Sequence, residues 1–311
     1  MNFRVTQLSL ARSALASIRD ASENLLRSQE QLATGRRINR LSDAPLDAAQ
    51  AERVRAHKTR LEQYSRNLEQ AQSRVEYASS TLLELTDLFV QARSICVEGA
   101  DATCDEAARR SLGEAVDQML QQTIDRANER YNGTYLFAGS ADDTAPFAAE
   151  RGPLGRIAAV TYQGNDDAIE LEAGPGSRVQ TNEPGSAIFL ADAEGPGAFE
   201  ALVELRDLLL NTEGLSHKEV SRALSDHIDA VSTAHDRVVA ATGRLGWRSS
   251  RLEFNRSVIE NGVTADDELL SRVHDADFAS AAAMLYGQQT ALQSALVMAA
   301  QVMKHTLLEY L

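Results

Sequence analysis

Apolar residues recur every seven positions along two long stretches of this chain. In the first half the repeat consists of Val54, Leu61, Leu68, Val75, Leu82, Phe89 and Cys96. A second line, offset by three residues, consists of Tyr64, Ala71, Ala78, Leu85 and Ala92. Large residues on one line and mostly small ones on the other are typical of helices that pack side by side. The pattern predicts a long helical rod that ends near Gly99 and the turn at 101–105.

The last third of the chain repeats this pattern. Its apolar line consists of Leu224, Val231, Val238, Leu245, Leu252 and Ile259, and its small residues are Ala234 and Ala241. Two matched rods can lie side by side, with large residues of one above the alanines of the other. Gly243 and Gly246 each cost up to about 1 kcal/mol relative to alanine inside a helix. Either a close backbone approach or a local bend would explain them. A further helix is predicted from a face formed by Leu112, Val116, Met119, Leu120 and Thr123.

Proline separates the two helical blocks. Pro45 is followed by 100 residues without proline, and the other five prolines all lie between positions 146 and 196. Short apolar runs in this region are separated by turn-forming clusters at 164–167, 174–176 and 183–185. The runs are Ile157–Tyr162, Ala168–Leu171 and Ala187–Leu190. We interpret them as strands of a small β-rich domain, placed at the far end of the rods.

Both ends of the chain carry narrow apolar stripes on otherwise polar helices. The predicted assembly interface consists of Leu8, Leu15, Ile18, Leu25 and Leu32 near the start, and Leu292, Leu296, Met303, Leu307 and Tyr310 near the finish. An isolated helix is marginally stable in water and cannot bury such a stripe alone. The ends are therefore expected to pair with each other or with neighbouring subunits.

The expected fold is mainly α. It is an elongated antiparallel helical bundle or coiled coil with both termini at one end and a small β-rich domain inserted between the helical halves. Residues 1–35 and 268–311 would form a terminal coiled-coil assembly domain. Residues 36–140 and 198–267 would form the helical rod, with a linker at 36–50. Residues 141–197 would form the inserted β-rich outer domain.

Charge and hydropathy exclude several classes of partner. The net charge of −14 opposes binding to nucleic acid or to anionic lipid, both of which attract a surplus of lysine and arginine. No stretch approaches the ~20 apolar residues that span a bilayer, so no membrane insertion is expected. The first eleven residues lack the apolar core of a cleaved signal peptide. We therefore expect a cytoplasmic protein or one exported by a route without such a signal.

No catalytic constellation emerges from the sequence. His217, His227 and His235 are spaced by ten and eight residues, which does not place paired ligands on adjacent helical turns. Cys96 and Cys104 are interpreted as two ordinary thiols rather than as a single bridge. We therefore expect no enzyme activity, no cofactor and no metal site.

One linker carries a family resemblance. The segment 32–39 followed by 42–45 resembles the link between terminal helix and rod in the flagellin family. The residues of this linker motif are Thr34, Gly35, Arg36, Arg37, Asn39, Asp43 and Pro45. The helical terminal thirds are similar to that family as well. Tyr131–Gly139, followed by Thr144–Phe147, resembles the branch of the family that joins the flagellar hook to its filament. Trp247 departs from what this resemblance leads us to expect.

The resemblance implies a function and a set of partners. It implies a structural adaptor that leaves through the flagellar type III export channel and stays outside the cell at the hook–filament junction. Implied partners are further copies in a ring or helical layer, the neighbouring hook-associated protein, flagellin, and an export chaperone on the C-terminal helix. The terminal helices would line the inner tube as coiled coils, often ordered only on assembly.

Two other functions remain open at this point. The chain could be flagellin itself, the bulk subunit of the filament. It could also be a cytoplasmic coiled-coil scaffold, which would explain the heptads and the missing signal peptide. A scaffold would not explain the β-rich insert or the apolar stripes at both ends.

Overall fold

The computed structural model describes the backbone of residues 2–40, 42–152, 155–191 and 195–308, and side chains from residue 12 to 301 within these ranges, together with Ser9. The chain forms two compact units. A terminal unit contains residues 1–61 and 261–311, and a central unit contains residues 62–260.

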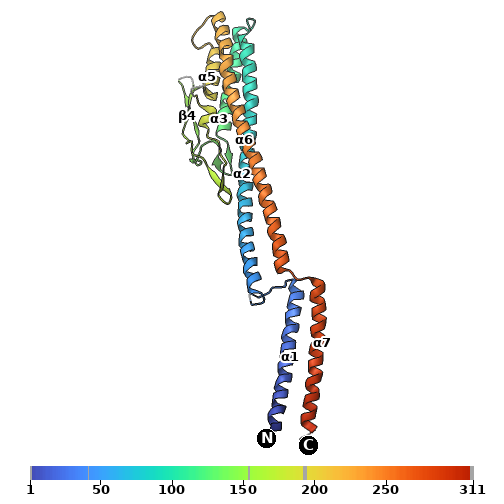
Figure 1. Ribbon diagram of the computed structural model, residues 1–311. Coiled ribbons are helices and arrows are strands. Elements are labelled where there is room, and N and C mark those ends of the chain that lie inside the picture. The colour runs from blue at the N-terminus through green and yellow to red at the C-terminus, as the bar shows by residue number, and fades with distance from the viewer. Residues whose placement is uncertain (1, 41, 153–154, 192–194, 309–311) are drawn as a thin grey trace. The chain divides into compact units, whose positions relative to one another are not determined.

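Long helices dominate both units (Figure 1). The helices are α1 (Asn2–Thr34), α2 (Pro45–Ala100), α3 (Glu106–Ala127), α4 (Ser186–Phe189), α5 (Ala198–Leu209), α6 (His217–His274) and α7 (Phe278–Leu308). The strands are β1 (Arg130–Tyr131), β2 (Thr134–Tyr135), β3 (Phe147–Arg151), β4 (Ile157–Tyr162), β5 (Glu170–Gly174) and β6 (Ser177–Gln180). The predicted mainly α fold with a small β-rich insertion is confirmed.

The heptad residues form the seam between α2 and α6. The predicted lines of large residues, from Val54 to Cys96 and from Leu224 to Ile259, are buried throughout, while Tyr64 on the second line of α2 is half-buried. In the central unit the Cys96 thiol lies 3.2 Å from the Leu224 carbonyl oxygen, and Gln72 donates to Ser249 across 2.9 Å. Because a late residue of α2 meets an early residue of α6, the two helices are antiparallel. Both cysteines are free, and burial raises the pKa of Cys96 to about 11.

Gly243 and Gly246 lie on the open side of α6. A Cβ atom at either position would have no heavy atom within 4 Å, so neither glycine permits a close backbone approach. The helix continues through both positions without a break.

Gly246→Ala is expected to raise the free energy of unfolding of the central unit by about 0.5–1 kcal/mol, because alanine loses less backbone entropy on folding. Gly113→Ala is the matched control in a helix, because its Cβ would meet the Leu210 side chain at 2.9 Å. That variant should be destabilised. Urea denaturation followed by circular dichroism measures both, and equal effects of the two substitutions would contradict the assignment.

The helix α3 forms a second layer of the central unit. Asp105 caps its start, since the carboxylate accepts a hydrogen bond of 2.7 Å from the Ala108 backbone N–H. Val116, Met119 and Leu120 are buried on one face, as predicted. The helix α5 packs against α3. Arg206 on α5 is buried and donates to Asp117 of α3 (3.0 Å) and to the Ile157 carbonyl oxygen (2.6 Å).

Three antiparallel two-stranded hairpins make up the β-rich segment. They pair β1 with β2, β3 with β4, and β5 with β6. The strand predicted at Ile157–Tyr162 is β4. The strand predicted at Ala187–Leu190 is wrong, because this run forms the short helix α4. A short apolar run does not distinguish a strand from a helical turn by periodicity alone.

The β-rich segment lies alongside the helices of the central unit, not beyond their far end as expected. Arg74 of α2 donates to the Thr134 hydroxyl (3.1 Å) and to the Tyr135 carbonyl oxygen (3.0 Å). Asn67 of α2 donates to the Glu172 carbonyl oxygen. Figure 1 likewise places β4 beside α3 and α5. Carbonyl oxygens of the hairpins thus accept hydrogen bonds from side chains on one side of α2.

A cluster of aromatic rings forms the core of this segment. The ring of Phe147 lies 5.1 Å from each of Tyr162, Phe189 and Phe199, measured between centroids. Phe137 adds a fifth ring, 5.6 Å from Phe189. Aromatic pairs at these separations add about 0.5–1.5 kcal/mol each beyond the burial of their area. The cluster joins strands β3 and β4 to helices α4 and α5.

Candidate assembly site

The predicted linker motif follows the end of α1 within the terminal unit. The helix ends at Thr34, and Gly35 adopts a left-handed conformation (φ 68°), as is common just past a helix C-terminus. The Thr34 hydroxyl donates to the Asn39 side-chain oxygen across 2.9 Å. The conformation of Gly35 and the hydrogen bond between Thr34 and Asn39 turn the chain away from the axis of α1.

Backbone hydrogen bonds join this linker to the one between α6 and α7. Arg37 N–H donates to the His274 carbonyl oxygen (2.8 Å), and Ala276 N–H donates to the Gly35 carbonyl oxygen (2.9 Å). Arg36 and Asp275 pair as an isolated antiparallel bridge. We call residues 35–37 and 274–276 the linker bridge. It holds the end of α1 and the start of α7 side by side.

The side chain of Arg37 reinforces the linker bridge. Its guanidinium donates to Asp47 and to the Val273 carbonyl oxygen, each across 2.7 Å, while its own carbonyl accepts from the Gln31 side chain (2.9 Å). The Arg37 and Asp47 side chains are both nearly half exposed, so solvent screens the ion pair. Its main effect is geometric, because one side chain fixes both linkers and the start of α2.

Asp43 and Pro45 close the linker motif. The Asp43 carboxylate accepts hydrogen bonds from the backbone N–H groups of Asn39 (3.3 Å) and Arg40 (2.9 Å). Pro45 occupies the first position of α2, where its missing N–H is not needed. The structure therefore brings all seven residues of the predicted motif into one connected turn.

A basic hollow of about 400 Å³ lies beside the linker bridge. Its walls are formed by Arg36, Ile38, Asn39, Arg40, Ala48, Ala51, Glu52, Arg55 and His274. His274 is buried, and this burial, together with the charges of Arg55 and Arg36, lowers its pKa. Asp275 opposes the shift. Sequence reasoning missed His274, whose isolated position at the end of α6 carries no motif.

His274 should make the linker bridge sensitive to acid. Because its folded pKa lies below the unfolded value of about 6.5, the unfolded chain takes up the proton first as pH falls. The bridge should be at full strength above that pH and weaken below it. Hydrogen-exchange protection of the Arg37 and Ala276 amides, corrected for intrinsic rates, should fall between pH 7.5 and 5.5. The His274→Gln variant should lose this dependence, and an unchanged profile would contradict the assignment.

The helices α1 and α7 pack antiparallel in the terminal unit (Figure 1). Their shielded positions are spaced alternately by four and three residues, as in a coiled coil. On α1 these are Ala14, Ile18, Ala21, Leu25, Ser28 and Leu32, and on α7 they are Ala281, Leu285, Gln288, Leu292, Ala295 and Ala299. Each of these positions is buried or half-buried. The mutual face is thus narrow and rich in small residues.

The predicted assembly stripes divide between two faces. Ile18, Leu25, Leu32 and Leu292 lie on the mutual face of the helix pair. Leu15 and Leu296 point outward and are 56% and 49% exposed. The remaining predicted positions, Leu8, Met303, Leu307 and Tyr310, lie outside the described side chains. The role of all these residues in assembly stays a prediction.

The outward surface of α7 is apolar and uncharged. Phe278, Met284, Tyr286, Val297 and Met298 are all exposed. Lys304 is the one Lys, Arg, Asp or Glu between residues 278 and 308, in a chain whose charged fraction is 24%. A helix that is apolar beyond its paired face is normally covered by further protein. The helix pair therefore presents a surface that suits contact with other subunits.

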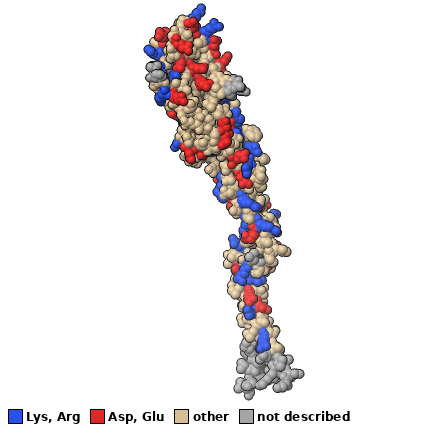
Figure 2. Space-filling model, turned by 90° about the vertical axis from the view of Figure 1, so that its left-hand side faces the viewer, with Lys and Arg blue, Asp and Glu red and all other residues tan. Residues whose placement is uncertain are grey.

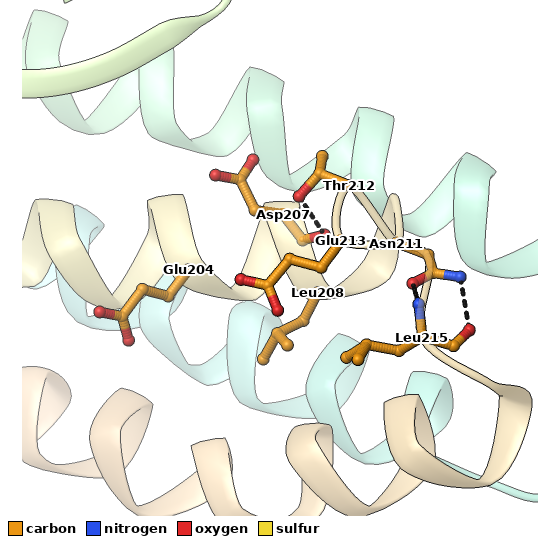
Figure 3. A pocket seen from close by; sticks show the side chains of 7 residues that line it. All are labelled: Glu204, Asp207, Leu208, Asn211, Thr212, Glu213 and Leu215. Carbon is orange, nitrogen blue, oxygen red and sulfur yellow. Dashed lines mark hydrogen bonds between the residues drawn. The ribbon is translucent and has the colours of Figure 1, made fainter.

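Another hollow, of about 340 Å³, lies in the central unit and is lined by the carboxylates of Glu204, Asp207 and Glu213 (Figure 3). Its Asn211 side chain is bonded to the backbone of Leu215 (2.7 and 2.9 Å). No three His, Cys, Asp or Glu side chains converge as metal ligands among the described residues. Within the same ranges, no helix combines the length and apolar character that a bilayer crossing requires.

A long antiparallel rod, paired terminal helices and bridged linkers define a class of helical structural subunits. Residues 5–142 match the bacterial flagellin N-terminal helical region, and residues 228–311 match the flagellin C-terminal helical region. The chain belongs to the flagellin family, whose members are structural proteins of the flagellum.

Several relatives share this plan over most of their length. Flagellar hook-associated protein 3 of Escherichia coli is 24% identical over 280 residues, covering 85% of this chain and 86% of that protein. Its Salmonella typhimurium counterpart is 24% identical over 306 residues, covering 94% of each. A flagellin of Listeria innocua is 23% identical over 269 residues, covering 85% and 83%. The crystal structure of the flagellar junction protein FlgL from Legionella pneumophila has a TM-score of 0.60 at 13% identity, covering 72% and 99%.

Proposed function

We propose that this protein is the structural adaptor that joins the flagellar hook to the filament. The observation that carries the proposal is the match to hook-associated protein 3 of Salmonella typhimurium along 94% of both chains. The match to the Listeria flagellin covers less of each chain. The alternative function, a bulk filament subunit, is therefore the less supported of the two.

The terminal unit carries one surface that meets other flagellar proteins. Its α1–α7 pair exposes an uncharged apolar surface, and its linker bridge joins the end of α1 to the start of α7. Partners on this surface are further copies of the chain in a ring or helical layer, the neighbouring hook-associated protein and flagellin. No catalysis and no cofactor take part in this role.

We also propose a route by which the protein leaves the cell. The protein leaves the cell unfolded through the flagellar type III channel and stays outside the cell at the junction. A chaperone covers the C-terminal helix beforehand, since α7 exposes apolar side chains between Phe278 and Met298. Without such cover, this surface would favour premature association in the cytoplasm.

Immunogold electron microscopy of whole flagella tests the location. An antibody against residues 141–197 should label a single spot where the hook meets the filament. Label along the filament would identify a flagellin instead. Absence from flagella and from the culture supernatant would favour the cytoplasmic scaffold, and either result would refute the adaptor function.

A further inference from the structure

The outer face of α6 exposes three large apolar side chains in the central unit. Trp247, Phe254 and Val258 are 66%, 68% and 54% exposed. Their spacings of seven and four residues place them on one face of the helix. The seam residues Leu245 and Leu252, two positions before Trp247 and Phe254, point the other way and are buried. We call Trp247, Phe254 and Val258 the Trp247 stripe.

A recess adjoins the stripe one turn earlier. Ala240, Gly243, Arg244, Trp247 and Arg248 line a shallow hollow on the surface of α6. No heavy atom lies within 4 Å of where a Cβ of Gly243 would stand. A protruding indole beside an empty glycine recess can interlock with side chains of another helix. Single exposed apolar residues are ordinary, whereas this combination indicates an interaction surface.

Arginine borders the stripe in a unit that is otherwise acidic, and two of these arginines, Arg244 and Arg248, are paired with the buried carboxylate of Glu183. Residues 237–252 contain four arginines and no aspartate or glutamate. The central unit as a whole carries 18 basic and 33 acidic residues, a net charge of −15. Figure 2 shows acidic side chains gathered over its upper part. The Arg251 guanidinium lies 5.8 Å from the centroid of the Trp247 ring and forms no ion pair within the described ranges. Tryptophan and arginine are the residues that most often carry binding energy at interfaces.

A complementary surface exists on α2 of the same unit. Leu83, Val90 and Val97 are exposed and recur every seven residues, which matches the spacing of Trp247 and Phe254. We call them the Leu83 stripe. The exposed acidic residues along this side are Glu76, Asp87, Glu98 and Asp101, against one arginine, Arg93. The Leu83 stripe is therefore aliphatic and lies among acidic side chains, whereas the Trp247 stripe is mainly aromatic and lies beside Arg251.

We propose that the Trp247 stripe of one subunit packs against the Leu83 stripe of a second copy of this chain. Two different surfaces meet in such a contact, so repetition produces a ring or a helical layer rather than a closed pair. The proposal deepens the proposed function, since it rests on the subunit forming a layer with itself. Trp247, which departs from the family resemblance, would thus form a contact between neighbouring subunits.

Trp247 is the single tryptophan of the chain, so its fluorescence reports on this face alone. In the dispersed full-length protein, emission should be that of an indole in water and acrylamide should quench it freely. In self-assembled particles collected by sedimentation, emission should move to shorter wavelength and quenching should fall several-fold. Trp247→Phe removes the signal, and Trp247→Ala should weaken self-association by about thirtyfold.

Cysteine cross-linking identifies the opposite surface. In a Cys104→Ser background, Trp247→Cys combined with Val90→Cys should give cross-linked chains on oxidation of intact flagella. Trp247→Cys combined with Gln118→Cys, an exposed position on α3, is the matched control and should not. Protein that sits at the junction but shows a water-exposed Trp247 and no cross-link overturns the contact, while leaving the adaptor function intact. A blue shift only when a different flagellar protein is added, or no self-association at any concentration, overturns it equally.

Discussion

Replacing Glu183 by glutamine should lower the free energy of unfolding of the central unit by about 3 kcal/mol. Glu183 is buried just before α4, and its carboxylate meets the guanidinium groups of Arg244 (2.5 Å) and Arg248 (2.6 Å) on α6. Arg248 is itself mostly shielded and also donates to the Asn182 carbonyl oxygen. Removing the negative charge leaves this arginine with too little compensation in a site that solvent hardly reaches.

The control for this prediction is Glu170→Gln. Glu170 pairs with Arg178 at 3.7 Å, and both side chains are largely exposed, so the expected change is within about 0.5 kcal/mol. Guanidinium denaturation followed by circular dichroism compares the two variants. If both lost the same amount, the Glu183 site would owe nothing to burial.

The rods could be predicted in detail because their determinants are local. A seven-residue period fixes which side of a helix is apolar, and no tertiary knowledge is needed to find the seam. The lines of large residues from Val54 to Cys96 and from Leu224 to Ile259 are accordingly buried. The glycines show the limit of this reasoning, since Gly243 and Gly246 look alike in sequence to the tightly packed Gly113 and differ only in what surrounds them.

The sequence predicts that the inserted segment is β-rich, but it does not predict that the segment lies alongside the helices. Its strand β4 follows from alternation and turn residues, while the position of the segment depends on side chains far away in sequence. Arg74 and Phe199 attach it to the helices, and nothing near either residue signals this. Nothing near Glu183 in the sequence signals its contacts either, because the residue belongs to a cluster that indicates only a turn.

The assembly site was predicted in part for a related reason. The linker motif has a distinctive order of Gly, Asn, Asp and Pro, and its seven residues meet in one turn. Its partner strand at 274–276 has no such signature. On the terminal helices, the apolar stripe covers more than one face, so the pattern alone does not separate Leu25, which faces α7, from Leu15, which does not.

Removing residues 300–311 is expected to abolish incorporation into the flagellum while leaving the central unit folded. The cut follows Ala299, the last shielded position of the mutual face among the described side chains, so the paired positions named above are retained. The removed residues include Met303, Leu307 and Tyr310, which belong to the predicted assembly interface. In limited proteolysis of the purified protein, the central unit should be as resistant as it is in the full-length chain. Electron microscopy of cells that express only the truncated form should show no label at the junction.

A point substitution separates loss of contact from loss of export. Val297→Asp adds a charge to the exposed apolar side of α7 and should prevent incorporation, because burying an unpaired carboxylate in a subunit interface is costly. Gln293→Glu, at an exposed polar position of the same helix, is the matched control and should assemble. Both variants should appear in the culture supernatant. If Val297→Asp assembled as well as the control, the outward face of α7 would not be a subunit contact, and the terminal helices would act through their mutual face alone.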